Sequence, residues 1–284
     1  MDTIDIFTDS LSDLPLTWCE LNKVVSVPVY VVFDNEQFYR DKTEITTEGI
    51  YQVVLKYGRL PGIAAPSVQD FVQIFTPTIV TGKKVLFISM TSKLSPVYKH
   101  AVEAADFFSE DSVVAIDSEV LSAGQAMMVN QAVQDVKRGL SMNKIVSKLE
   151  KAKTKLKYEM VFDNLLYVAK GGQVYGLKNK VKSPLKLREI INIQTAKLNL
   201  FVQSKENLLG IADKLYFVNN KEFINRELVI ISHTMAEEPA EYLNNVLIDQ
   251  LGVDEVMVTP SICGLLSRSK PRSLNIGYML QSSK

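Results

Sequence analysis

The 284-residue chain contains only two cysteines, Cys19 and Cys263, which lie far apart in the sequence. Neither belongs to a CxxC pair or to another close spacing typical of metal ligands, so the sequence predicts no disulfide framework and no cysteine-based metal site. The first residues, MDTIDIFTDS, lack the basic segment and apolar core of a signal peptide. Both observations predict a cytoplasmic protein.

The sequence also lacks an excess of charge and a long apolar run. Its 32 basic and 32 acidic side chains balance, so there is no electrostatic reason to expect binding to nucleic acid or to an anionic membrane. No uninterrupted apolar stretch approaches the roughly 18–20 residues that a membrane helix needs. If the protein handles lipid, we expect it to do so as a soluble carrier without stable membrane insertion.

Signals of catalysis are few. Only two histidines occur, His100 and His233, and the sequence has no GxSxG, Walker, HExxH or GxGxxG motif. A serine nucleophile needs a base within hydrogen-bond reach, and no pairing in the sequence suggests one. We therefore expect a binding protein that has no catalytic residues, no metal and no cofactor, and that is not an enzyme.

The most informative stretch is Val85 to Phe108. Apolar, strand-forming residues lead into the hydroxyl-rich turn Ser89-Met90-Thr91-Ser92, and a helical pattern follows, with Ser95 predicted as its N-cap and Pro96 as its first residue. Such a unit directs backbone N–H groups, hydroxyls and the positive end of a helix dipole to one place, where a small anion such as a carboxylate fits. The hydroxyls of Thr91, Ser92 and Ser95 could instead simply cap the helix.

The same order of strand, polar turn and helix occurs twice more. A strand over Ile4–Thr8 leads into Asp9-Ser10, and one over Val113–Ile116 leads into Asp117-Ser118-Glu119 and a helix over Ser122–Lys137. This alternation predicts parallel βαβ units, in which ligands bind at the carboxyl ends of the strands. The three polar turns should therefore lie along one rim of the sheet.

The remaining pattern predicts a change of domain near residue 157, with a parallel α/β/α domain over 1–157 and a smaller α+β domain with a mixed sheet over 158–284. In the first domain we expect an edge strand over Val24–Phe33 interrupted by Pro28, a hairpin to Tyr39, a loop over Gly58–Ala65, and helices over Thr47–Tyr57, Val68–Phe75 and Met142–Lys157. In the second we expect strands over Tyr158–Phe162, Ile190–Gln194, Leu198–Val202, Leu228–His233, Glu255–Thr259 and Ser273–Gln281, and helices over Asn164–Lys170, Glu206–Val218 and Ala236–Leu251.

Six segments resemble the DegV family, soluble bacterial proteins that carry fatty acids, over essentially the whole chain. They are FTDSLSDLP at 7–15, LPGIAAPS at 60–67, SKLSPVYKHA at 92–101, IDSEVLSAGQ at 116–125, GGQ at 171–173 and ISHTMAEE at 231–238. The resemblance implies a two-domain α/β fold, a buried long-chain acyl tail and a carboxylate held at the strand-end rim. Some family members present that carboxylate to a separate fatty-acid kinase subunit.

The chain departs from the family pattern at the head-group positions. The usual TSQPS is here Ile63 to Ser67, so Ile63 replaces a hydroxyl, and the usual GGR ends in Gln173. In the stretch that matches IGxHxGPG poorly, Arg268 takes the histidine position and lies beside Lys270 and Arg272.

These departures leave several functions open. In the first, a fatty acid still binds, Ser92 donates a hydrogen bond and Arg268 supplies the charge, because a guanidinium matches a carboxylate. In the others, the protein binds a different small anion, acts as a regulatory or interaction protein, or is the substrate-binding subunit of a small-molecule kinase with a rim histidine. The candidate ligand-binding residues are Asp9, Ser10, Ile63, Thr91, Ser92, Ser95, Asp117, Ser118 and Arg268.

Overall fold

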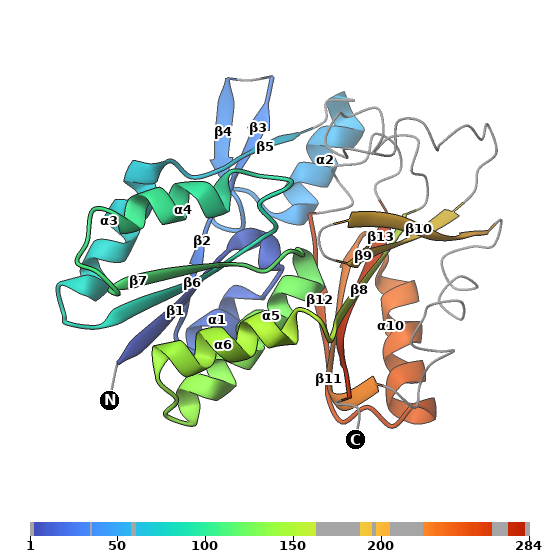
Figure 1. Ribbon diagram of the computed structural model, residues 1–284. Coiled ribbons are helices and arrows are strands. Elements are labelled where there is room, and N and C mark those ends of the chain that lie inside the picture. Colours follow the sequence, from blue (N-terminus) through green and yellow to red (C-terminus); the bar gives the residue numbers. More distant parts are fainter. Residues whose placement is uncertain are drawn as a thin grey trace.

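The computed structural model describes residues 3–34, 36–57, 61–162, 188–194, 197–204, 224–262 and 272–281. The strands in these ranges form a four-stranded parallel sheet, a three-stranded antiparallel sheet and a six-stranded mixed sheet. Figure 1 shows the parallel sheet with its helices on one side of the molecule and the mixed sheet on the other. The predicted α/β fold with a parallel and a mixed sheet is confirmed.

The parallel sheet consists of β1 (Ile4–Asp9), β2 (Val24–Val27), β6 (Lys84–Ser89) and β7 (Val113–Asp117), in the order β2-β1-β6-β7. Its two central strands are almost entirely buried, which explains why VLFIS in β6 reads as a continuous apolar run. Asp9, Ser89 and Asp117 end three adjacent strands, so their turns share one edge of the sheet.

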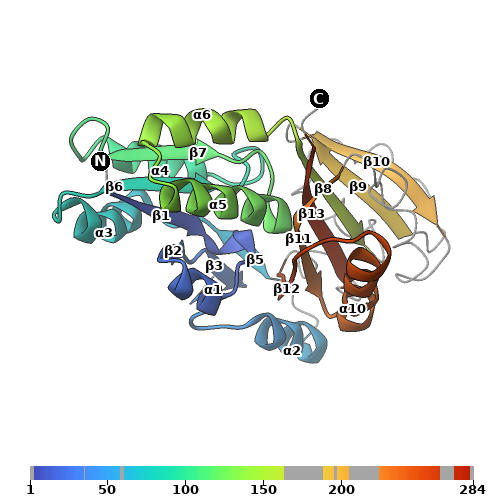
Figure 2. The ribbon, with the colours of Figure 1, turned by 90° about the horizontal axis from the view of Figure 1, so that it is seen from below.

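Helices cover both faces of this sheet (Figures 1 and 2). Helices α3 (Val68–Ile79) and α4 (Val97–Ala105) lie on one face, and α5 (Ser122–Lys137) and α6 (Met142–Ala152) lie on the other; the short α1 (Leu16–Leu21) packs beside β2. Ser67 and Asp70 form the capping box that starts α3. The rings of Phe71 and Phe75 then pack against Phe87 of β6, with centroids 5.1 and 6.0 Å from it.

The antiparallel sheet corrects two predictions. Pro28 does not merely interrupt one strand: it separates β2 from β3 (Tyr30–Phe33), which pairs with β4 (Gln37–Arg40) in a projecting hairpin, because proline cannot donate to a sheet ladder. Part of the predicted loop over 58–65 is a strand, β5 (Gly62–Ala64), which pairs with β3. Helix α2 (Thr47–Tyr57) lies close to this sheet.

The mixed sheet has the order β10-β9-β8-β13-β11-β12, and only its β11–β12 pair is parallel. The strands are β8 (Leu156–Phe162), β9 (Arg188–Gln194), β10 (Lys197–Ser204), β11 (Ile224–Thr234), β12 (Val256–Pro260) and β13 (Ser273–Leu280). The helix predicted over Ala236–Leu251 is α10 (Glu237–Asn245) followed by a π-helical segment, Val246–Gln250. The helices predicted over 164–170 and 206–218 lie outside the described residues.

Helix α5 packs between the two large sheets. Ile230 of β11 belongs to the core that contains α5, whereas its neighbour Ile231 belongs to the core under α10, as expected for alternating strand faces. Gly277 of β13 faces α5 so closely that a Cβ there would lie 2.4 Å from the Ala123 carbonyl oxygen. Only glycine permits this approach without a backbone shift.

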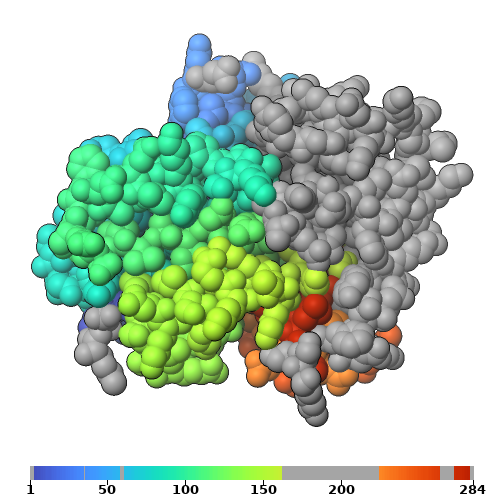
Figure 3. All heavy atoms as spheres, viewed as in Figure 1, coloured from blue at the N-terminus to red at the C-terminus, as the bar shows by residue number. Residues whose placement is uncertain are grey.

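The chain enters the mixed sheet earlier than predicted. The helix expected to reach Lys157 ends at Ala152, and Leu156, expected on its inner face, begins β8 and pairs with Met279. The Leu280 N–H also donates to the Lys155 carbonyl (2.9 Å), and Figure 3 shows the surface of α6 next to the C-terminal strand. The boundary at 157 as a division between folding units stays a prediction.

Within the described residues, no helix combines the length and the apolar character that a membrane span requires.

Candidate functional site

The turn after β6 is held from one side by Asp9, at the end of β1. The Asp9 carboxylate accepts hydrogen bonds from the Met90 N–H (2.7 Å), the Gln125 side-chain amide (3.0 Å) and the Leu11 N–H (3.1 Å). Asp9 is fully buried, and burial raises the pKa of its carboxyl to about 6, although these hydrogen bonds lower it. Asp9 therefore fixes two turns relative to each other.

The same turn is held from the other side by Asp117, at the end of β7. Its carboxylate accepts a hydrogen bond from the Ser92 N–H (3.2 Å to Oδ2) and another from the Glu119 N–H (2.8 Å). The backbone adds two bonds between the turns, from the Thr91 N–H to the Val120 carbonyl (2.7 Å) and from the Ser118 N–H to the Ser89 carbonyl (3.0 Å). The prediction that the three polar turns share one rim is confirmed.

Three of the candidate residues use their hydroxyls inside the protein. Ser10 Oγ accepts from the Val29 N–H (3.1 Å), Thr91 Oγ1 accepts from the Lys93 N–H (3.5 Å), and Ser118 Oγ donates to the Val120 carbonyl (3.0 Å). All three residues are buried. Their observed contacts stabilise the turns, and contact with a ligand stays a prediction for them.

Ser92 and Ser95 lie at the surface of the rim, before α4. Ser92 is exposed and Ser95 is half-buried. The prediction that Ser95 caps the helix is wrong: α4 begins at Val97, its N-cap is Pro96 with ψ 6°, and no side chain caps it. A turn closed by the Leu94 N–H to the Thr91 carbonyl (3.2 Å) precedes it, so the helix starts later. The first turn of α4 contains no acidic residue, so no side chain of the helix itself offsets the positive end of its dipole.

The other predicted residues lie around this rim or outside the described part of the chain. Ile63 is in β5, opposite Val31, and packs partly buried against the core. His100 Nδ1 lies 2.8 Å from the Pro66 carbonyl oxygen, so it connects α4 to the segment after β5 rather than lying free on the helix surface. Arg268 lies outside the described residues. Arg272, from the same basic cluster, donates from Nε to the Met235 carbonyl (2.9 Å).

His233 is half-buried near the end of β11, and burial lowers the pKa of its imidazole. Its Nδ1 accepts a hydrogen bond from the Ala236 N–H (3.4 Å), which makes it an end-group of the strand.

A second polar cluster, which the sequence did not predict, joins the two large sheets. The hydroxyl of Ser122, the first residue of α5, bonds both the Asp13 carboxylate and Ser232 Oγ of β11, the latter at 2.5 Å. Asn275 of β13 donates to Ser232 Oγ (3.2 Å), and Thr259 of β12 donates to the Asp13 carbonyl (2.6 Å). We call these five residues the junction cluster.

The junction cluster combines burial with backbone strain. Asp13 and Ser122 have φ values of 57° and 55°, in the left-handed region that costs non-glycine residues energy and that is common at functional sites. Burial raises the pKa of the Asp13 carboxyl to about 6, although Lys42 and hydrogen bonds from Ser122 and Ser261 lower it. The only sequence signal was the second aspartate of the segment FTDSLSDLP.

Within the described residues, no group of three or more His, Cys, Asp or Glu side chains is arranged to hold a metal ion. The rim offers the exposed Ser92 hydroxyl beside the positive dipole end of α4, which suits the recognition of a small anion.

Comparisons with known proteins agree with the segments quoted above. A family model described as "Uncharacterised protein, DegV family" matches residues 3–280. A DegV domain-containing protein of Caldanaerobacter subterraneus is 26% identical over 280 residues, covering 98% of this chain and 99% of that protein.

Solved structures show the same fold. A fatty-acid-binding DegV family protein from Thermus thermophilus superposes with a TM-score of 0.86 at 23% identity, covering 98% of this chain and all of the other. The Streptococcus pneumoniae Fatty Acid Kinase (Fak) B3 protein loaded with linoleic acid gives a TM-score of 0.81 at 18% identity, with 98% and 100% coverage.

Proposed function

Because this chain belongs to the DegV family, we propose that it binds a long-chain fatty acid and carries or presents it, without performing chemistry of its own. The fold that it shares with a fatty-acid-binding Thermus thermophilus protein and a linoleate-loaded Streptococcus pneumoniae protein supports this proposal. The buried free thiol of Cys19 agrees with a cytoplasmic setting.

The observation that carries the proposal is the double clamp on the turn after β6. Asp9 and Asp117 bind the backbone of Met90 and Ser92 from the two flanking strands, so the position of this turn is fixed before any ligand arrives. The Ser92 side chain stays exposed, next to the uncapped start of α4. The fatty-acid carboxylate would accept a hydrogen bond from Ser92 Oγ there. Arg268, outside the described residues, is the proposed charge partner.

The tail would supply most of the affinity. Burial of a sixteen-carbon chain at ~0.8 kcal/mol per CH₂ amounts to roughly 10 kcal/mol before the cost of ordering. The polar rim would then fix which end of the ligand faces outward rather than how tightly it is held.

A fatty-acid carboxylate held at the rim of the sheet would be accessible to a partner protein. The Streptococcus pneumoniae relative is named as a B3 protein of a fatty acid kinase, and this agrees with presentation of the head group to a kinase subunit. A rim that holds only the carboxylate of a buried acyl chain would leave that carboxylate within reach of such a partner.

The direct test is to identify the lipid that travels with the protein. We expect denaturing mass spectrometry of protein purified from bacteria to show a long-chain saturated or mono-unsaturated fatty acid at close to one per chain. Delipidated protein should take up added palmitate to the same ratio. Preparations without lipid that also fail to take up palmitate would contradict the proposal and favour a different anion or a regulatory role.

The head-group position is tested by Ser92→Ala. Loss of one hydrogen bond to a charged group should weaken palmitate binding by about 1.5 kcal/mol, roughly tenfold, as measured by isothermal titration calorimetry. Ser141→Ala is the matched control, because Ser141 is also exposed and makes no side-chain cap bond at the start of α6. Equal affinities of the two variants would place the carboxylate elsewhere.

A further inference from the structure

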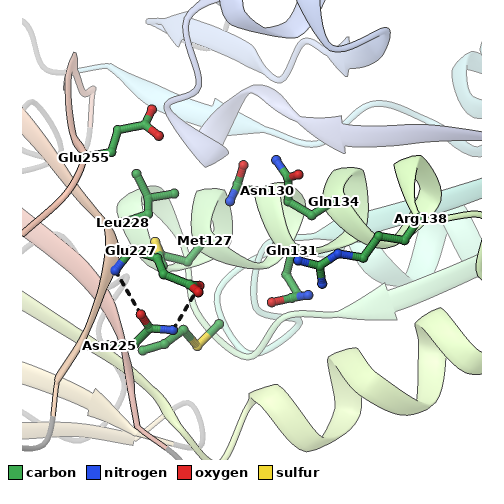
Figure 4. A pocket seen from close by; sticks show the side chains of 10 residues that line it. Met127, Asn130, Gln131, Gln134, Arg138, Asn225, Glu227, Leu228 and Glu255 are labelled. Carbon is green, nitrogen blue, oxygen red and sulfur yellow. Dashed lines mark hydrogen bonds between the residues drawn. The ribbon is translucent and has the colours of Figure 1, made fainter.

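A polar pocket lies between α5 and the mixed sheet. It has a volume of about 290 Å³ and is lined by Asn130, Gln134 and Arg138 of α5 and by Asn225, Glu227 and Glu255 of the mixed-sheet part, with Met127 and Met279 as apolar contacts (Figure 4). None of these lining residues belongs to the three rim turns, so the pocket is distinct from the proposed fatty-acid head-group site.

Several polar groups of this pocket have no partner among the described residues. The half-buried side chains of Asn130 and Gln134 and the exposed side chain of Glu255 make no hydrogen bond to this part of the protein, so they are open to solvent or a ligand. Glu227 is positioned by Asn225, which donates to one of its carboxylate oxygens (3.2 Å) and accepts from its N–H (2.9 Å). One oxygen of Glu227 is thus left for a ligand. Groups of this kind can recognise a ligand without breaking internal bonds.

The charges of the pocket lie at opposite ends. Arg138 NH1 lies 3.7 Å from an oxygen of the fully buried Asp135, which also binds Lys148 and Gln131. The guanidinium is 65% exposed, so most of its N–H groups remain for an acceptor. Figure 4 shows Arg138 on one side of the pocket and the two glutamates on the other, where Leu228 lies between Glu227 and Glu255. Asn130 and Gln134 are drawn between the two sides.

The composition of the pocket excludes several ligand classes. No aromatic side chain among the described residues lines it, so it offers no stacking surface for a base or a sugar ring. Its few apolar residues do not suit a lipid, and two carboxylates do not suit a simple anion. Its volume is at the lower limit of ligand pockets, so the ligand is small.

We propose that this pocket binds a small zwitterion, an amino acid or a short peptide, whose carboxylate contacts Arg138 and whose ammonium contacts Glu227, while Glu255 adds negative charge to the same side of the pocket. The amides of Asn130 and Gln134 are placed to bind the polar groups between the two charges.

The test uses L-glutamine and the dipeptide L-alanyl-L-glutamine as probes, each also in an N-acetylated and a C-terminally amidated form. Binding is followed by the NMR signals of the Met127 and Met279 methyl groups, at probe concentrations up to about 10 mM. We expect shifts with at least one of the two zwitterions. Each blocked form should bind at least tenfold more weakly, since each loses one charge-assisted contact. Tighter binding of L-glutamine would identify the ligand class as free amino acids, and tighter binding of the dipeptide would identify it as short peptides.

Variants assign the two ends. Arg138→Gln should weaken the binding of the zwitterion at least tenfold but leave the affinity for the amidated form unchanged, because that form has no carboxylate. Glu227→Gln should also weaken the binding of the zwitterion at least tenfold but leave the affinity for the N-acetylated form unchanged, because that form has no ammonium. Lys137→Gln is the matched control, because Lys137 is adjacent to Arg138 but bonds Asn22 instead. Unchanged thermal unfolding of each variant establishes that it is folded. The proposal is overturned if neither zwitterion shifts the methionine signals, or if blocked and unblocked probes bind equally.

Discussion

Asp9 has the sequence pattern of a ligand-binding residue, but all of its observed contacts are internal. Its two oxygens accept from two backbone N–H groups and the Gln125 amide, whereas Gln125 Oε1 has no partner among the described residues. Gln125 Nε2 also donates to Thr8 Oγ1 (2.9 Å) and to the Ile88 carbonyl (3.2 Å), so three acceptors fix the orientation of its amide. Burial of Asp9 outweighs its hydrogen bonds and raises the pKa of its carboxyl, so the folded protein favours the proton more than the unfolded chain does.

This leads to a pH prediction for Asp9→Asn. An unfolded aspartate titrates near 3.8 and the folded Asp9 near 6, so between these values the folded state binds more protons. The contribution of Asp9 to stability is therefore greatest below pH 4, decreases as pH rises to about 6, and is constant above. The total change is at most roughly 3 kcal/mol. An asparagine side chain does not titrate in this range, so the variant should lack this decrease.

The measurement is urea unfolding of the wild type and the variant from pH 4 to 7. The difference between their free energies of unfolding should change across that range in the direction given, whereas the difference for Ser141→Ala, an exposed site where no titratable group changes, should stay constant. Parallel curves for the wild type and Asp9→Asn would show that Asp9 does not gain a proton on folding.

At this scale the sequence predicted where polar residues gather but not which way they face. Thr91 and Ser92 are neighbours with similar side chains, yet Thr91 is buried and Ser92 is exposed. The difference arises from the two clamps on the turn, which come from residues distant in the sequence. Ser122 and Asp13 are 109 positions apart, so no local pattern could pair them.

Among the elements, the approach of β13 to α5 depends on one glycine. A Cβ at Gly277 would lie 2.4 Å from the Ala123 carbonyl oxygen, a backbone atom that cannot move away alone. We expect Gly277→Ala to destabilise the protein by about 3 kcal/mol or more, measured by urea unfolding. Gly62→Ala is the control, because its nearest neighbour would be 3.8 Å away. Similar losses in both variants would mean that the helix and strand adjust freely.

Element boundaries followed from the sequence where local chemistry decides them. The helix start predicted at Val68 matches α3, where Ser67 and Asp70 form a local capping box. The predictions failed where tertiary pairing decides: Leu156 continues a helical pattern, but its pairing with Met279 places it in a strand. Likewise, residues 62–64 have loop composition and become a strand because β3 offers them an edge.

In the whole molecule, the junction cluster connects the rim to the mixed sheet. Asp13 follows the turn that contains Asp9, Ser122 begins α5, and Ser232 and Asn275 belong to the mixed sheet. Ser122, the first residue of α5, therefore bonds to Asp13 beside the parallel sheet and to Ser232 of the mixed sheet. A ligand that contacts both the rim and the mixed sheet would need these two parts to hold a fixed relative position. A network of buried, hydrogen-bonded polar groups is suited to fix such a position.

A double-mutant cycle on Ser122 and Ser232 tests this connection. Ser122→Ala removes a partner of the Asp13 carboxylate, and Ser232→Ala removes the acceptor of the Asn275 amide, so each change should destabilise the protein by about 1–3 kcal/mol. Because the two hydroxyls are 2.5 Å apart, the double variant should lose about 1 kcal/mol less than the sum of the single variants.

The matched control is the exposed pair Ser109 and Ser112, whose hydroxyls are 2.6 Å apart within one loop. Solvent can replace that bond, so its coupling free energy should be close to zero. All free energies come from urea unfolding followed by tryptophan fluorescence and circular dichroism, which should give one shared transition in the wild type. Additive effects of Ser122→Ala and Ser232→Ala would show that the two hydroxyls are not coupled. Apolar packing on α5 would then be what holds the rim in position relative to the mixed sheet.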